Sequence, residues 1–182
     1  MLWWSPDPRM VLRPSAFKLS RSLRQRIKRG DYEIRVDTCF TRVMQCCAEP
    51  RDGQSGSWIG SAMLEVYSRL HQQAYAHSIE TWMEGELVGG LYGLAIGRMF
   101  YGESMFARRT DASKLALAHL CQKLDACAFG LIDCQMETPH LASLGATPIA
   151  RTAFIREVQE LVNLQPVGNP FLSPWKTGCA SL

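Results

Sequence analysis

The middle of the chain constrains the fold most, because residues 76–103 have the pattern of three consecutive strands joined by tight turns. Apolar residues alternate in 76–83 and nearly fill 86–96, and Glu84-Gly85 and Gly97-Arg98 have turn composition. We expect strands over 76–83, 86–96 and 99–103. Strands joined by such short turns pair antiparallel. Three glycines within residues 89–93 predict a bulge or a close approach of another backbone.

Helical patterns precede and follow this meander. Ser20 is expected to begin a helix that Gly30 ends, and Asp37 to cap a second helix that runs through Cys47. Further helices are expected over 61–73, 111–129, 138–145 and 152–162, and short strands over 10–12, 32–36 and 131–135. This order predicts an α+β fold, with a mixed, mostly antiparallel sheet flanked by helices.

Composition excludes several classes of protein. A chain of 182 residues with 47% apolar residues is long enough to bury a core and too apolar for disorder. It contains no run of ~18 uncharged apolar residues, so we expect no membrane-spanning helix. The seven cysteines include no C-x-x-C pair, which argues against a disulfide framework and against a zinc site. We therefore expect a reduced, cytoplasmic protein without a metal.

Positive charge is concentrated near the start of the chain. Residues 9–42 hold ten Lys or Arg and three acids, a net charge of +7. Arginine predominates there, and its planar guanidinium suits phosphate. The asymmetry indicates a nucleic-acid partner, although a solvated basic helix face gives the same composition. The candidate phosphate contacts are Arg21, Arg24, Arg26, Lys28 and Arg29.

Eight short motifs follow one another along the chain. They are W-W-S-P-D-P-R at 3–9, G-S-W-I at 56–59, H-S-I-E-T-W at 77–82, E-L-V-G-G-L-Y-G at 86–93, F-Y-G-E-S-M-F at 100–106, A-S-K at 112–114, L-I-D-C-Q at 131–135 and H-L-A-S-L-G-A at 140–146. In this order the chain resembles the leucyl/phenylalanyl-tRNA–protein transferases. The resemblance implies a GNAT-like acyltransferase fold that takes its acyl group from aminoacyl-tRNA. Residues 107–114 accordingly lack the glycine-rich loop of acetyl-CoA enzymes.

The resemblance also implies an activity and its partners. The family moves leucine or phenylalanine, and sometimes methionine, from aminoacyl-tRNA to the N-terminal α-amine of proteins that begin with Arg or Lys, which marks them for degradation. It needs no cofactor, and we expect a monomer. Family members begin with an N-terminal domain, so we expect residues 1–15 to be the remnant of a junction to that domain and residues 16–182 to form the catalytic domain.

The resemblance assigns polar residues to the reaction. Gln135 is expected to contact the attacking amine, Asp133 to polarise that amine or collect its charge, and Glu103 to lie beside the acyl-donor pocket. Positions two apart on a strand share a face, so Asp133 and Gln135 are expected together. Cys134 is then expected on the opposite face, in the core. The motif residues His77 and Glu80 have no derivable chemical role, and we expect His77 to be structural.

Four further residues match family positions around the donor. Leu91, Phe100 and Ile132 are expected to surround the aminoacyl side chain, although ordinary core positions have the same character. Trp58 is expected to stack on the terminal adenine, although it could instead cover the core. Two other functions stay open: a GNAT-type enzyme that uses acetyl-CoA, and a tRNA-binding remnant without catalysis.

Overall fold

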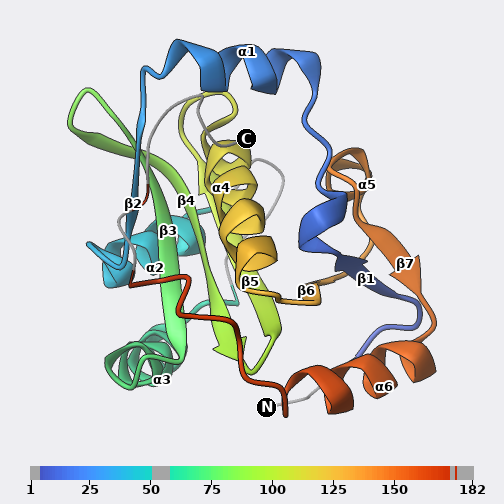
Figure 1. The fold of residues 1–182 in the computed structure, drawn as a ribbon. Coiled ribbons are helices and arrows are strands. Elements are labelled where there is room, and N and C mark those ends of the chain that lie inside the picture. The colour runs from blue at the N-terminus through green and yellow to red at the C-terminus, as the bar shows by residue number, and fades with distance from the viewer. Residues whose placement is uncertain (1–4, 51–57, 173–174, 176–182) are drawn as a thin grey trace.

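The computed structural model describes residues 5–50, 58–172 and 175. A seven-stranded sheet runs through it in the order β2-β3-β4-β5-β6-β1-β7 (Figure 1). Its strands are β1 (Arg9–Leu12), β2 (Glu33–Val36), β3 (Ala76–Met83), β4 (Glu86–Ile96), β5 (Met99–Ala107), β6 (Leu131–Gln135) and β7 (Thr147–Ile149). Neighbouring strands are antiparallel except β5 and β6, which are parallel. The mixed, mostly antiparallel sheet that we expected for an α+β fold is therefore confirmed.

Helices cover both faces of the sheet. They are α1 (Arg21–Arg29), α2 (Phe40–Ala48), α3 (Ser61–Gln72), α4 (Ala112–Ala126), α5 (Pro139–Ser143) and α6 (Arg151–Leu161). The long helix α4 packs against one face of the sheet and connects β5 to β6, two strands that are parallel (Figure 1). One core forms between α4, α1 and the sheet, and a second forms where α2 and α3 cover β3 and β4.

Glycines in β4 allow the backbone of this strand to pack closely against α4 and β5. A Cβ on Gly89 would lie 2.5 Å from the Ala112 Cβ, so the start of α4 packs directly on the β4 backbone. A Cβ on Gly93 would lie 2.2 Å from the Tyr101 carbonyl oxygen, and the β4–β5 register shifts between Tyr92 and Gly93. The expected bulge and close backbone approach are both confirmed.

The ends of α1 follow the predicted signals, but the start of α2 does not. The Ser20 Oγ accepts a hydrogen bond from the Leu23 N–H at 3.1 Å, and Gly30 ends α1 in the left-handed conformation. The expectation that Asp37 caps α2 is wrong. Its carboxylate instead accepts hydrogen bonds from His77 and from the Ser78 N–H, because its backbone turns away from the helix with φ +58°.

Two features of the sheet differ from the sequence expectations. β5 continues past Glu103 to Ala107 because its last residues pair with Gly89–Leu91 of β4. β7 was not expected and adds an edge strand beside β1. The strand expected over 10–12 is present as β1, which pairs with β6 on one side and with β7 on the other.

Candidate active site

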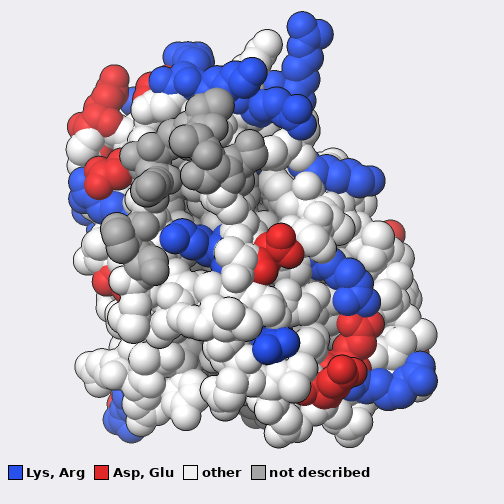
Figure 2. Space-filling model, in the orientation of Figure 1, with Lys and Arg blue, Asp and Glu red and all other residues white. Residues whose placement is uncertain are grey.

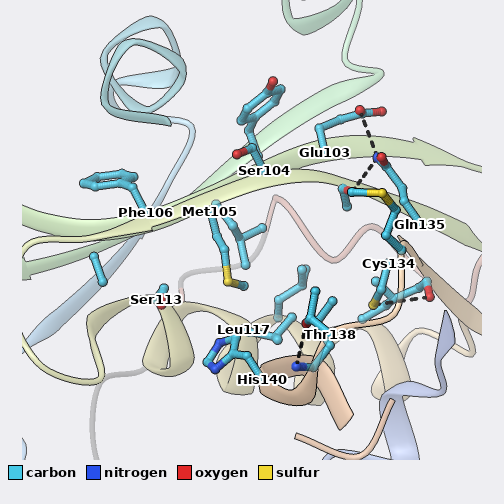
Figure 3. Close-up of a pocket in the computed structure, with 18 of the residues that line it drawn as sticks. Glu103, Ser104, Met105, Phe106, Ser113, Leu117, Cys134, Gln135, Thr138 and His140 are labelled. Carbon is cyan, nitrogen blue, oxygen red and sulfur yellow. Dashed lines mark hydrogen bonds between the residues drawn. The ribbon is translucent and has the colours of Figure 1, made fainter. Parts of the chain in front are cut away.

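A cavity of about 750 Å³ opens beside β5 where the parallel ladder ends. β5 and β6 pair over three positions, Met99–Tyr101 with Leu131–Asp133. Beyond Tyr101, β5 continues to Ala107 and no longer pairs with β6. The cavity is lined by residues of β4, β5, β6, α4 and α5. Figure 3 shows Glu103 and Gln135 meeting at one end, and Met105, Leu117 and His140 around the space beside α4.

Gln135 and Glu103 form the polar end of this cavity. The Gln135 side-chain amide donates to the Gly102 carbonyl oxygen at 3.0 Å and to the Glu103 Oε2 at 3.3 Å (Figure 3). Burial raises the pKa of Glu103, and hydrogen bonds from Tyr67 and Gln135 act in the opposite direction. A carbonyl oxygen only accepts hydrogen bonds, so the amide nitrogen of Gln135 must face Gly102 and its amide oxygen is turned elsewhere.

Asp133 lies at the base of the same polar end and is 2% exposed. Its two carboxylate oxygens accept hydrogen bonds from Arg9, at 2.9 Å from Nε and at 2.7 Å from an Nη. Its Oδ1 also accepts from the backbone N–H of Gln135 at 2.9 Å. The structure therefore brings Asp133, Gln135 and Glu103 together, and adds Arg9, which the sequence analysis did not single out.

Apolar side chains form most of the remaining wall. Leu91, Phe100 and Ile132 each have at most 3% of their surface exposed, and all three line the cavity. Other apolar or sulfur-bearing residues, which were not expected there from the sequence, also line the cavity, among them Met105, Leu117, Leu120 and Cys134. Leu117 and Leu120 recur at helical spacing along α4, but such periodicity does not distinguish a cavity wall from a filled core.

Cys134 packs against the core, as expected, but it also lines the cavity. Burial raises the pKa of its thiol to about 12, and the neighbouring Asp133 carboxylate contributes to this shift. A thiolate is the nucleophilic form of cysteine, so the side chain is inert at neutral pH. Its position indicates a wall residue and not a nucleophile.

Trp58 stands at the rim of the cavity with 56% of its surface exposed. The alternative in which this tryptophan covers the core is therefore not observed. Met136, directly after Gln135, also lines the cavity and is 59% exposed. Two large apolar side chains thus stand open to solvent at the cavity, an arrangement that is typical of a binding site.

The basic residues of α1 lie apart from the cavity, since none of them lines it. Figure 2 shows a row of basic side chains over the edge of the molecule where α1 runs. Arg21, Arg24 and Lys28 are exposed, whereas Arg26 and Arg29 both pair with Asp31, at 3.2 and 2.9 Å. The structure therefore leaves three of the five candidate phosphate contacts without an ion pair among the described residues.

His77 and Glu80 hold the fold together. His77 lies 2.7 Å from the Asp37 carboxylate and stacks on Phe171. Glu80 is fully buried and accepts hydrogen bonds from the backbone N–H groups of Thr38 and Cys39 at the start of α2. The expectation of a structural histidine is confirmed, and Glu80 has a structural role that the sequence did not reveal.

The six cysteines in the described part of the chain form no disulfide bond with one another. Within the same residues, no group of three or more His, Cys, Asp or Glu side chains is arranged to hold a metal ion. Among the described helices, none is both long and apolar enough to cross a membrane.

The crossover helix, the mostly antiparallel sheet and the cavity beside its parallel strand pair define an α+β domain with a candidate site. A solved structure of a Bacteroides thetaiotaomicron protein of unknown function overlaps it with a TM-score of 0.56 at 15% identity, covering 79% of this chain and 56% of that one. A GCN5-related N-acetyltransferase from Kribbella flavida overlaps with a TM-score of 0.46 and 13% identity, covering 80% of this chain and 55% of that one.

The family follows from the sequence comparisons. The family model of leucyl/phenylalanyl-tRNA protein transferase matches residues 11–159. A curated leucyl/phenylalanyl-tRNA–protein transferase of Thiobacillus denitrificans is 57% identical over 93% of this chain and 74% of its own length. The transferase of Nitrosomonas europaea is 58% identical over 88% of this chain and 68% of its own length. The chain belongs to the leucyl/phenylalanyl-tRNA–protein transferase family.

Proposed function

We propose that this protein transfers leucine, phenylalanine or methionine from aminoacyl-tRNA to the α-amine of proteins that begin with Arg or Lys. The observation that carries the proposal is the cavity itself, in which an apolar wall ends at the Gln135–Glu103 pair. The apolar wall suits the side chain of the aminoacyl residue. The polar end suits the ester, the amino group of the aminoacyl residue and the attacking α-amine. We further propose that it acts as a cytoplasmic monomer in protein degradation.

The reaction is the aminolysis of an ester, and the attacking amine must be neutral. An α-amino group has a pKa of about 7.7–8.0, so a useful fraction is unprotonated at neutral pH and no strong general base is needed. The task of the site is then to orient the amine and to support the tetrahedral intermediate. We assign orientation to Gln135.

Gln135 suits this role because its amide nitrogen is already occupied. Both of its N–H groups face acceptors, the Gly102 carbonyl and Glu103, so the amide oxygen is left to accept a hydrogen from the attacking amine. Such a contact turns the nitrogen lone pair toward the ester carbon. An amide is too weak a base to keep the proton, so we assign its transfer to the ribose hydroxyl next to the ester. This hydroxyl takes the proton of the amine as the C–N bond forms and gives its own proton to the ester oxygen that leaves as the C–O bond breaks.

Glu103 and Trp58 complete the donor site in this proposal. Glu103 lies beside Gln135 and, as a carboxylate, would pair with the ammonium group of the aminoacyl residue. Trp58 stands exposed at the rim, where its indole would stack on the terminal adenine, a contact worth ~1–3 kcal/mol. Exposed Arg21, Arg24 and Lys28 on α1 would bind the phosphates of the tRNA.

The donor distinguishes this function from its alternatives. The purified protein is incubated with an Arg-initiated peptide and with either leucyl-tRNA or acetyl-CoA, each carrying a labelled acyl group. We expect label from leucyl-tRNA alone to reach the peptide. Label from acetyl-CoA would identify an N-acetyltransferase instead. Binding of leucyl-tRNA without transfer would identify an RNA-binding protein.

The apolar wall predicts a selectivity among donors. Leu91, Phe100 and Ile132 offer no hydrogen-bonding side chain, so the cavity distinguishes donors by shape. We expect leucine, methionine and phenylalanine to be transferred and the Cβ-branched residues isoleucine and valine to react about 10–200-fold more slowly, the range for small apolar differences. The measurement is kcat/KM with each aminoacyl-tRNA. Equal values for leucine and isoleucine would contradict the assigned pocket.

The basic face of α1 predicts a salt dependence. Replacing Arg21 and Arg24 by glutamine is expected to flatten the log–log plot of tRNA affinity against salt by ~0.7–0.9 for each phosphate that the variant no longer neutralises. The matched control replaces Arg69 and Arg156, which are exposed on α3 and α6, and is expected to leave the slope unchanged. If both double variants have the wild-type slope, α1 does not bind phosphate.

A further inference from the structure

Arg9 and Asp133 form a buried, two-point ion pair at the base of the cavity. The guanidinium contacts both carboxylate oxygens, at 2.9 and 2.7 Å, and the Arg9 side chain is 14% exposed. The guanidinium also lies over the Phe154 ring of α6, 5.2 Å from its centroid. A planar guanidinium that is held on two sides fixes both the position and the rotation of its carboxylate.

The same carboxylate controls the backbone that carries Gln135. The Asp133 Oδ1 accepts the Gln135 N–H at 2.9 Å, and Gln135 has a left-handed backbone with φ +65°. For a residue other than glycine this region is strained, and the residue stays there only where its surroundings hold it. The bond to Asp133 holds this turn, and the turn carries the Gln135 amide to Gly102 and Glu103.

Arg9 reaches this point because β1 pairs with β6. Met10 lies opposite Gln135 and Val11 opposite Asp133, with an irregular register between Met10 and Val11. Without Arg9, Asp133 would be a buried carboxylate with no cation in contact with it among the described residues. A buried charge left alone is strongly unfavourable, so the side chain would move or take up a proton. Either change would release the Gln135 turn.

We propose that Arg9 is a positioning residue for acyl transfer, which acts through Asp133 on the backbone turn that aims Gln135. The inference rests on the proposed function, and it gives Asp133 a different task from the one expected from the sequence. Because both Asp133 oxygens are engaged by Arg9, Asp133 holds the turn and does not collect the proton of the attacking amine. Arg9 itself touches neither substrate.

The kinetic test compares Arg9→Gln and Arg9→Lys with the matched control Arg13→Gln. Arg13 lies just after β1, in an exposed ion pair with Glu157. We expect Arg9→Gln to lower kcat about 100-fold, the cost of a misplacement of about 1 Å, while KM for aminoacyl-tRNA stays within about twofold. Arg9→Lys keeps the charge but not the two-point contact, so we expect an intermediate kcat. Arg13→Gln is expected to match the wild type.

A double-mutant cycle tests the route through Asp133. If Arg9 acts through Asp133, Arg9→Gln adds no more than about twofold to the loss caused by Asp133→Asn. Losses that multiply, a change in KM alone, or full activity of Arg9→Gln would each overturn the proposal. All variants are assayed well below their melting temperatures, so that unfolding does not contribute.

A second readout needs no activity and therefore separates this proposal from the proposed function. Hydrogen exchange of the Gln135 backbone N–H is expected to be about tenfold faster in Arg9→Gln than in Arg13→Gln, because its acceptor is no longer fixed. An unchanged exchange rate would overturn the positioning role even in a protein that transfers leucine. If the exchange is faster in Arg9→Gln but the wild-type protein transfers no leucine, the positioning role is supported and the proposed function is refuted.

Discussion

Replacing Gln135 by alanine is expected to slow transfer of leucine about 100-fold or more, while KM for leucyl-tRNA changes little. In the proposed function the apolar wall and Trp58 bind the donor, and the variant leaves them intact, whereas it removes the amide oxygen that is proposed to orient the attacking amine. A loss that falls on kcat and kcat/KM equally identifies an interaction made only in the transition state. The measurement is steady-state kinetics at saturating Arg-initiated peptide.

One further variant separates the effect of the Gln135 amide group from the effect of its backbone conformation. Gln135→Asn keeps an amide and tolerates the left-handed backbone, but its side chain is one methylene too short to reach Gly102 and Glu103 together. We expect it to be nearly as slow as alanine. Gln45 is an exposed glutamine on α2 and serves as the control. Wild-type rates in both Gln135 variants would exclude Gln135 from the reaction.

Replacing Glu80 by glutamine is expected to cost about 3–5 kcal/mol of folding free energy, because two or more buried donors lose their acceptor at about 1–3 kcal/mol each. The carboxylate has no exposed surface and accepts from the Thr38 and Cys39 N–H groups at 2.9 and 2.8 Å. It also accepts from the Ser78 hydroxyl and from the Trp82 indole, each at 3.0 Å. The amide of glutamine would turn an N–H₂ group toward these donors.

Thermal unfolding measures this effect. For a chain of this length a loss of about 3–5 kcal/mol lowers Tm by about 6–20 °C. The control is Glu86→Gln, a change at an exposed position at the start of β4, which is expected to leave Tm within about 2 °C of the wild type. A Glu80→Gln protein with the control's Tm would show that the network does not stabilise the start of α2.

The elements predicted best are those whose signals are local. The strands of the meander follow from the turns Glu84-Gly85 and Gly97-Arg98, and α1 follows from Ser20 and Gly30. Each of these residues acts on backbone within a few positions of itself. The α2 start was predicted wrongly because its N–H groups are satisfied by Glu80, more than forty residues away in the chain.

Long-range contacts limit the prediction of the site for the same reason. Asp133 and Gln135 could be placed together because they share one strand, but the partner of Asp133 is Arg9, 124 positions away. The cavity depends on where the β5–β6 ladder ends, which is a property of two strands and not of either sequence. Cys134 is an example. The alternation of side chains along β6 predicts the face of the sheet on which Cys134 lies, but not that this face borders a cavity.

Mass spectrometry of the product shows whether an aminoacyl group has moved from tRNA to the α-amine of a protein, as proposed. The acceptor is a peptide that begins with Arg and contains one internal lysine, and the donor is leucyl-tRNA. We expect a single added leucine on the N-terminal α-amine, and none on a peptide whose N-terminus is acetylated. Leucine on the internal lysine, or no leucyl peptide at saturating donor, would contradict it.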